Sequence, residues 1–167
     1  MIFRRGHRLP REVAAQLKPH DALAVAELQD GSWAVVSTGA LLVADAAGIR
    51  AHHPWHAVQH GRWDGELRRF TVSWVDGAQP PLVLTTASDD VETFTAAVRE
   101  RVQSSVVHTE TAETPHGTLL RAQIRRGEDG ALFSQLTAQG PLQGDEDERR
   151  VIDALESRAR AAVGLPT

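Results

Sequence analysis

Apolar residues alternate with more polar neighbours from Asp21 to Thr86, and this period of two constrains the fold more than any other feature of the sequence. The alternating positions are Leu23 and Val25, Trp33 and Val35, Leu41 and Val43, Trp55 and Ala57, Phe70, Val72 and Trp74, and Leu82 and Leu84. Successive side chains of a strand point to opposite faces, so the pattern predicts short strands with a buried face. The segments between them carry the Gly, Asp or Pro that a tight reversal needs, and the sequence therefore predicts an antiparallel meander.

Three helices are predicted around the strands. Pro10 suits the first position of a short helix over 10–18. A longer helix opens at 88–90, with Asp89 and Glu92 at capping-box spacing, and Asp145 and Glu148 open the last helix in the same way. Each longer helix carries one apolar stripe, formed by Val91, Phe94, Val98 and Val102 in the first and by Ile152, Leu155, Ala159 and Val163 in the second. The first of the two is therefore expected to cover a sheet or the mouth of a barrel.

A second part of the chain begins at Ser105. The segments 106–111, 118–126 and 131–138 predict three more strands before the last helix. We expect two parts, residues 1–104 and residues 105–167. Because no low-complexity linker separates them, we expect the second part to pack on the first.

Four short phrases of the sequence resemble a known family. They are 53–58 (HPWHAV), 61–64 (GRWD), 74–77 (WVDG) and 98–107 (VRERVQSSVV), and residues 20–138 as a whole are similar to actinobacterial proteins with pleckstrin-homology-like (PH-like) domains. The resemblance implies an α+β fold, a PH-like antiparallel barrel or sandwich closed by a C-terminal helix, with a β-strand plus helix extension. It implies no catalytic residues and no cofactor.

Composition and charge argue against several classes of function. A formal net charge of -4 and a pI near 6.0 argue against binding to nucleic acid. The chain has no cysteine, and therefore neither a disulfide nor a thiol nucleophile. It has no apolar run of about 18 residues and no export signal, so we expect no integral membrane association and a cytoplasmic location.

A basic cluster beside a tryptophan is the first candidate ligand site. Arg62, Arg68 and Arg69 with Trp63 have the side chains that pair with and stack on an anionic ligand. The alternative is that Arg69 and Thr71 belong to the polar face of a strand whose other face is core.

Histidines form the second candidate. His52, His56 and His60 would share one face of an extended strand, and imidazole is a common zinc ligand. Residues four apart on a strand are ~13 Å apart, too far for one ion, so we expect no metal site unless Pro54 bends the chain. A small hydrolase or lyase that uses this cluster with a carboxylate is the rival interpretation of the sequence.

Lipid binding is the third class considered. The hairpin 29–32 offers one acid and no base, which predicts no phosphoinositide recognition there. The N-terminus keeps peripheral membrane binding open, because residues 1–20 carry a net charge of +4 from five basic residues, Arg4, Arg5, Arg8, Arg11 and Lys18, and one acidic residue, Glu12.

Sequence motifs of common enzymes are missing. The chain has no Gly-x-Ser-x-Gly elbow, no glycine-rich phosphate loop and no His-Glu-x-x-His. We therefore expect a non-enzymatic module that binds a protein or peptide partner, or a second copy of itself.

Overall fold

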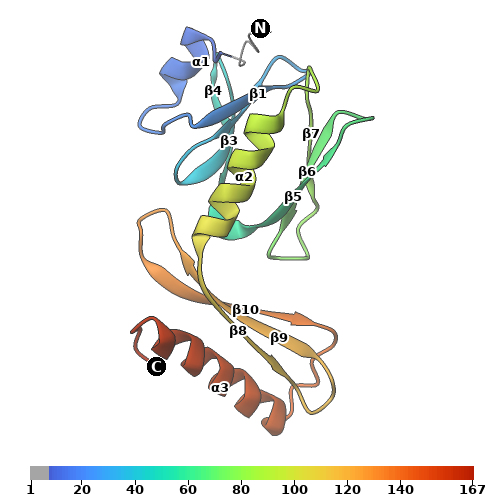
Figure 1. The fold of residues 1–167 in the computed structure, drawn as a ribbon, viewed down its shortest axis with the longest axis vertical. Coiled ribbons are helices and arrows are strands. Elements are labelled where there is room, and N and C mark those ends of the chain that lie inside the picture. The colour runs from blue at the N-terminus through green and yellow to red at the C-terminus, as the bar shows by residue number, and fades with distance from the viewer. Residues whose placement is uncertain (1–7) are drawn as a thin grey trace, which may run out of the picture. The chain divides into compact units, whose positions relative to one another are not determined.

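Two compact units make up the chain in the computed structural model, which describes residues 8–167. The division lies between Gln103 and Ser104. Within the described residues, the N-terminal unit has seven strands in two sheets, and the C-terminal unit has three strands in one sheet and a helix (Figure 1). The sheets are antiparallel and none closes into a barrel. The α+β class is thus confirmed, and of the two architectures expected, barrel or sandwich, the closed barrel is not formed.

The first sheet is a four-stranded meander. It contains β1 (Ala24–Glu27), β2 (Trp33–Val36), β3 (Ala40–Asp45) and β4 (Gly48–Pro54), in that spatial order. Its two faces border different cores: Val36 and Leu41 belong to one, and Val35 and Leu42 to the other. Because both faces are covered, every residue of β2 is buried, and so is every residue of β3 except Asp45.

The second sheet contains β5 (Val58–Asp64), β6 (Arg69–Trp74) and β7 (Leu82–Thr85) in the order β5-β6-β7. It meets the end of β1 at one corner, where a bridge joins Leu28 to Thr86 and the Ala87 N–H donates to the Glu27 carbonyl at 2.8 Å. The two sheets share a core, to which each contributes buried apolar side chains. A single bridged corner leaves the rest of the β1 edge without a neighbouring strand.

Two helices cover the cores of this unit. The short α1 (Arg11–Gln16) packs Val13 against the first sheet. The longer α2 (Glu92–Ser105) contributes Phe94 and Val98 to the core shared by the two sheets, which confirms the predicted stripe. The first hydrogen bond of α2 runs from the Thr95 N–H to the Val91 carbonyl. The helix therefore begins beyond Asp89, and the capping box predicted for Asp89 and Glu92 is wrong.

Trp55 and Ala57 do not form the predicted strand. They lie in η1 (Trp55–Ala57), a turn of 3₁₀ helix that links β4 to β5. Pro54 has no N–H to donate to a strand partner. The Trp55 indole is buried, as expected, and its Nε1 donates to the Ser37 carbonyl at 2.9 Å. This buried hydrogen bond holds the bend between the two sheets.

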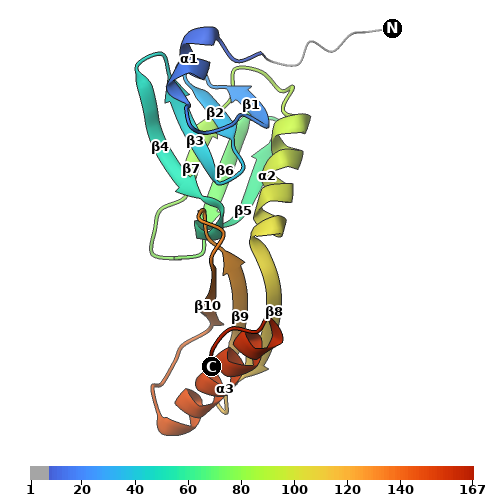
Figure 2. The ribbon, with the colours of Figure 1, turned by 90° about the vertical axis from the view of Figure 1, so that its left-hand side faces the viewer.

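The C-terminal unit contains β8 (Val106–Glu113), β9 (Leu119–Arg126) and β10 (Leu132–Gln139), in the order β10-β9-β8, and α3 (Glu146–Ala162). Figure 2 shows α3 beside this sheet. Leu120 and Ile124 of β9 share a core with Leu155 and Ala159 of α3, which confirms the predicted elements of this part. The packing of the C-terminal part on the N-terminal part stays a prediction.

Candidate functional site

A groove of about 660 Å³ lies between the start of β1 and α2 in the N-terminal unit, where the helix lies next to the strand (Figures 1 and 2). It is lined by Leu23, Ala24 and Thr38 on the sheet side and by Glu92, Thr93, Ala96, Ala97, Glu100 and Arg101 on the helix side. Leu23 is 52% exposed beside this groove. Its side chain, with the two alanines of α2, gives the groove an apolar floor.

The groove continues toward the first turn of α2. A second pocket of about 310 Å³ shares Leu23, Ala24 and Thr93 with the first, so the two pockets adjoin each other beside β1. Val25 and Asp90 line this continuation. The second pocket thus contains one carboxylate, of Asp90, and one guanidinium group, of Arg8.

Backbone groups of β1 at Val25 lie on the edge of the strand that faces away from β2. The Leu28 N–H donates to Ser32 within the first hairpin, whereas the Gln29 N–H donates to the Thr85 carbonyl at the corner with β7. Strand backbone groups alternate between the two sides, so Val25 presents its N–H and C=O to the same edge as Glu27 and Gln29. Among residues 8–167, no strand pairs with that edge at Val25, and Val25 lines the second pocket. An extended peptide would find main-chain partners there.

Polar residues fix the rim of the groove. Thr38 donates to Asp21 twice, from its N–H at 2.8 Å and from its Oγ1 at 2.6 Å. The Thr38 hydroxyl is the main reason that the pKa of Asp21 is lowered. Arg101 pairs with Glu100 at 3.1 Å. Carboxylates outnumber guanidinium groups in the two pockets, which favours a partner with a positive charge.

The structure does not bring Arg62, Trp63, Arg68 and Arg69 onto one surface. Trp63 pairs with Phe70 and packs against the core, whereas Arg62 and Arg69 lie on the opposite, exposed face of the second sheet. Arg69 stands across from Asp64 in the register of the two strands. The alternation of buried and exposed residues along β6 confirms the polar-face interpretation.

Arg68 has a structural role. It has a φ of 50°, and its Nη1 donates to the Ala87 carbonyl at 3.0 Å. Its own carbonyl accepts from the Thr86 N–H at 2.8 Å. These contacts tie the β5–β6 turn to the segment before α2. Anion binding by the two exposed arginines stays a prediction, without stacking on Trp63.

The three histidines of the rival interpretation lie on three elements. His52 is on β4, His56 on η1 and His60 on β5, so they do not share the face of one strand. The ring centroids of His52 and His20 are 5.5 Å apart. Residues 8–167 contain no group of three potential ligands that could hold a metal ion. Burial is the main reason that the pKa of His53 is lowered.

The turn of the first hairpin is held by the carboxylate of Asp30, which lies within it. Asp30 accepts from the Ser32 N–H at 3.0 Å and from the Ser32 hydroxyl at 2.5 Å, and these bonds lower the pKa of Asp30. A carboxylate held in its charged form at this turn would repel a phosphate. That this hairpin does not bind phosphoinositides stays a prediction. Arg4 and Arg5, on which the basic N-terminus depends, lie outside the described residues.

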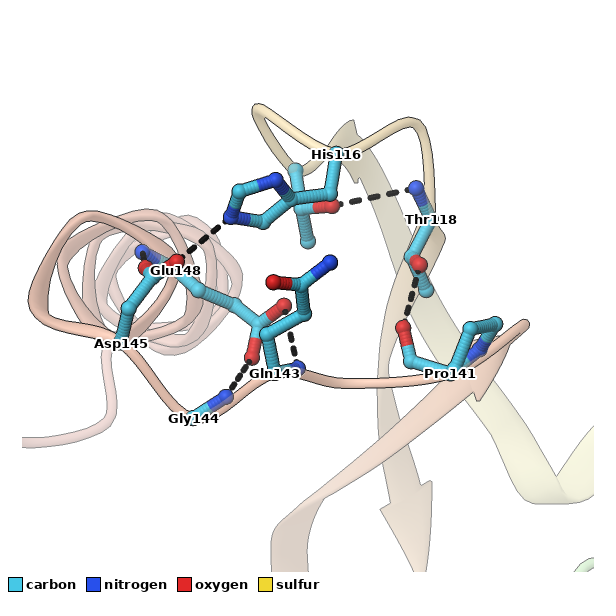
Figure 3. Close-up of polar contacts among 8 residues, drawn as sticks. His116, Thr118, Pro141, Gln143, Gly144, Asp145 and Glu148 are labelled. Atoms are coloured by element: carbon cyan, nitrogen blue, oxygen red, sulfur yellow. Dashed lines mark hydrogen bonds and ion pairs between the residues drawn. The ribbon is translucent and has the colours of Figure 1, made fainter.

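A polar cluster at the start of α3 has a structural explanation (Figure 3). The Asp145 Oδ1 accepts from the Glu148 N–H at 2.8 Å, which confirms the predicted capping pair. Glu148 is 1% exposed and accepts from the Gly144 N–H at 2.8 Å and the Gln143 N–H at 3.2 Å. His116, in the β8–β9 turn, contacts Asp145 at 2.5 Å and joins the turn to the helix. The cluster caps α3.

Comparison with protein-family models and with curated proteins finds no match for the sequence. Among residues 8–167, no helix is long and apolar enough to span a membrane. The groove is the functional feature that sequence patterns did not identify. Its only signal was Leu23, an apolar residue at the start of the first strand.

Proposed function

We propose that the N-terminal unit is a PH-like module that binds an extended peptide segment of a partner protein in the groove between β1 and α2. The groove is the observation that carries this proposal: it combines an open strand edge with an apolar floor. Support for the PH-like assignment comes from the order of the elements, seven strands in two sheets followed by one helix. In this proposal the module acts in the cytoplasm.

Strand addition is the recognition mode that fits the groove. A peptide that pairs with Val25 needs only its main chain to form hydrogen bonds, while alternate side chains enter the groove. Leu23, Ala96 and Ala97 leave room for a small or medium apolar side chain. The two pockets together are lined by three carboxylates and two guanidinium groups, and this excess of negative charge favours a lysine or arginine of the peptide.

Binding is favoured over hydrolysis because of the chemistry of the lining. The groove residues include no histidine, and its two hydroxyl groups, of Thr38 and Thr93, have no imidazole beside them to act as a general base. The hydrolase or lyase alternative needs His52, His56 and His60 to converge with a carboxylate. Three histidines on three elements, outside the groove, give it no support.

A peptide library displayed on phage and selected on the full chain tests the proposal. Selected peptides are expected to carry an apolar residue near a basic one, and Ala96→Trp, which fills the groove, is expected to weaken their binding at least about tenfold, or about 1.4 kcal/mol. Ala15→Trp, a matched change at an exposed position of α1, is the control. Amide NMR shifts at Val25 and Ala97 locate the site. Equal binding by the Ala96→Trp variant, or selection of no peptide, would reject the proposal.

A further inference from the structure

The outer edge of β10 lacks the features that usually protect an edge strand. β10 is the last strand of its sheet, and its register with β9 runs from Leu132 to Gln139 without a bulge. Its sequence, LFSQLTAQ, contains no charged residue and no proline. Lysine, proline and bulges are the usual means by which edge strands avoid pairing with another chain. This edge has none of them over eight residues.

The opposite edge of the same sheet is protected. β8 has a register shift between Val106 and His108 and carries Glu110 and Glu113. A bulge and negative charges both oppose the addition of a further strand. Of the two edges, β10 is therefore the one suited to pairing.

The hydrogen-bond phase of the hairpin shows which residues of β10 face outward. The Gly127 N–H donates to the Ala131 carbonyl at 2.8 Å, so alternate residues from Phe133 onward bond to β9. Leu132, Ser134, Leu136 and Ala138 then direct their N–H and C=O groups away from the sheet. Within residues 8–167, no other segment forms a backbone hydrogen bond to these four residues.

Leu136 stands in the middle of this edge. It pairs with Ala122, which is fully buried under α3, but is itself 38% exposed. α3 packs mainly over β8 and β9, which leaves the outer part of the face near Leu136 uncovered. An apolar side chain at the centre of an open, uncharged edge is best covered by an equivalent side chain.

Two charged side chains of α3, those of Glu156 and Arg160, lie beside Ser134 of β10 and pair with each other. Glu156 accepts a hydrogen bond from the Ser134 hydroxyl, and the Arg160 Nη1 lies 4.0 Å from Glu156 and 3.4 Å from the Ser134 Oγ. A second copy of the chain that approaches this edge would present the same Glu156–Arg160 pair, which carries no net charge. Like-charge repulsion therefore does not oppose the approach of two copies.

We infer that two copies of the chain pair through β10 in an antiparallel fashion about a two-fold axis at Leu136. In this register Leu136 lies opposite Leu136 of the second copy, and Ser134 lies opposite Ala138 of the second copy. The outward groups of 134–138 then form about six main-chain hydrogen bonds, and each exposed leucine covers the other. In the dimer, the outer β10 edge of each copy is paired with that of the other, and the β8 edges stay protected. The assembly therefore closes as a dimer with a six-stranded sheet.

Sedimentation of the full chain over a range of concentrations measures the pairing. A reversible monomer–dimer equilibrium is expected, and Leu136→Lys is expected to shift its dissociation constant at least about tenfold upward by placing a charge on the edge. Val107→Lys on β8, at a site 39% exposed, is the matched control and is expected to leave the equilibrium unchanged. Circular dichroism checks that both variants are folded.

A cysteine at the axis tests the register directly, since the chain has no cysteine of its own. Residues opposite each other in a hydrogen-bonded pair have Cα atoms about 5.5 Å apart, within the range that a disulfide spans. Leu136→Cys is expected to form a cross-linked dimer under mild oxidation, and Val107→Cys is not. A monomer at all concentrations, or cross-linking no faster at 136 than at 107, would overturn the inference.

Discussion

Gly61 is a position at which the backbone of β5 lies directly against a side chain of the core. A Cβ at this position would lie 2.3 Å from the Cζ of Phe70, a buried ring that packs edge-on against Phe94 with 5.3 Å between centroids. Two rings in mutual contact have little room to shift. The glycine therefore lets β5 lie directly over Phe70.

Replacing Gly61 by alanine is expected to lower the free energy of unfolding by about 1–3 kcal/mol, the usual cost of overpacking a core. Urea denaturation followed by tryptophan fluorescence measures the effect. Gly77→Ala is the control, because a Cβ there meets nothing within 4 Å and a change within about 0.5 kcal/mol is expected. Equal stability of the two variants would show that Phe70 gives way without cost.

Asp145 is the residue through which acid is expected to loosen the start of α3. The Glu148 N–H and then His116 lower its pKa below the ordinary value of 3.8. A carboxylate with a depressed pKa in the folded state stabilises the fold above its unfolded pKa, and this stabilisation is lost as the pH falls through the folded pKa. We therefore expect the α3 cap to weaken only below a pH of about 4.

Carboxyl-carbon NMR measures this titration in the intact chain. Asp145 is expected to titrate below 3.8, and His116→Ala is expected to raise its pKa only part of the way, since the Glu148 N–H still donates to it. A pKa for Asp145 at or above 3.8 in the unaltered chain would contradict the assigned hydrogen bonds.

Among the elements, α3 depends on a buried carboxylate at its first turn. Glu148→Ala removes the acceptor of the Gly144 and Gln143 N–H groups and is expected to lower the free energy of unfolding by about 1–3 kcal/mol. Glu148→Gln keeps one acceptor oxygen and is expected to lose less. Glu146→Ala, whose side chain is exposed, is the control, and urea denaturation followed by circular dichroism is the measurement. Equal losses at 146 and 148 would contradict the role of the buried carboxylate.

Elements with one buried face were the ones predicted best from the sequence. β6 alternates along its whole length, and the period of two therefore predicts both its extent and its orientation. Trp55 was misassigned because its hydrogen bond to Ser37 bends the chain, and a contact 18 positions away leaves no local pattern. The groove was missed for the same reason, since Leu23 and Ala96 become neighbours only when α2 packs beside β1.

At the scale of the whole molecule, the C-terminal unit has little core of its own. Its buried apolar cluster consists of three residues of β9 and two of α3, namely Leu120, Ala122, Ile124, Leu155 and Ala159. It also buries Arg125, whose guanidinium donates to the Ser105 hydroxyl at 2.9 Å and whose pKa is lowered by burial. Three strands with one helix and a buried cation are a small basis for independent stability.

We therefore expect residues 105–167 alone to show no cooperative thermal transition and little dispersion of amide NMR signals, while the full chain unfolds cooperatively. The fragment is measured by calorimetry and NMR at a low and a high protein concentration, so that pairing through β10 does not obscure its intrinsic stability. A cooperative transition with dispersed signals at both concentrations would identify the C-terminal unit as an independent domain. The direct passage from α2 into β8 would then join two separately stable units, because α2 ends at Ser105 and β8 begins at Val106.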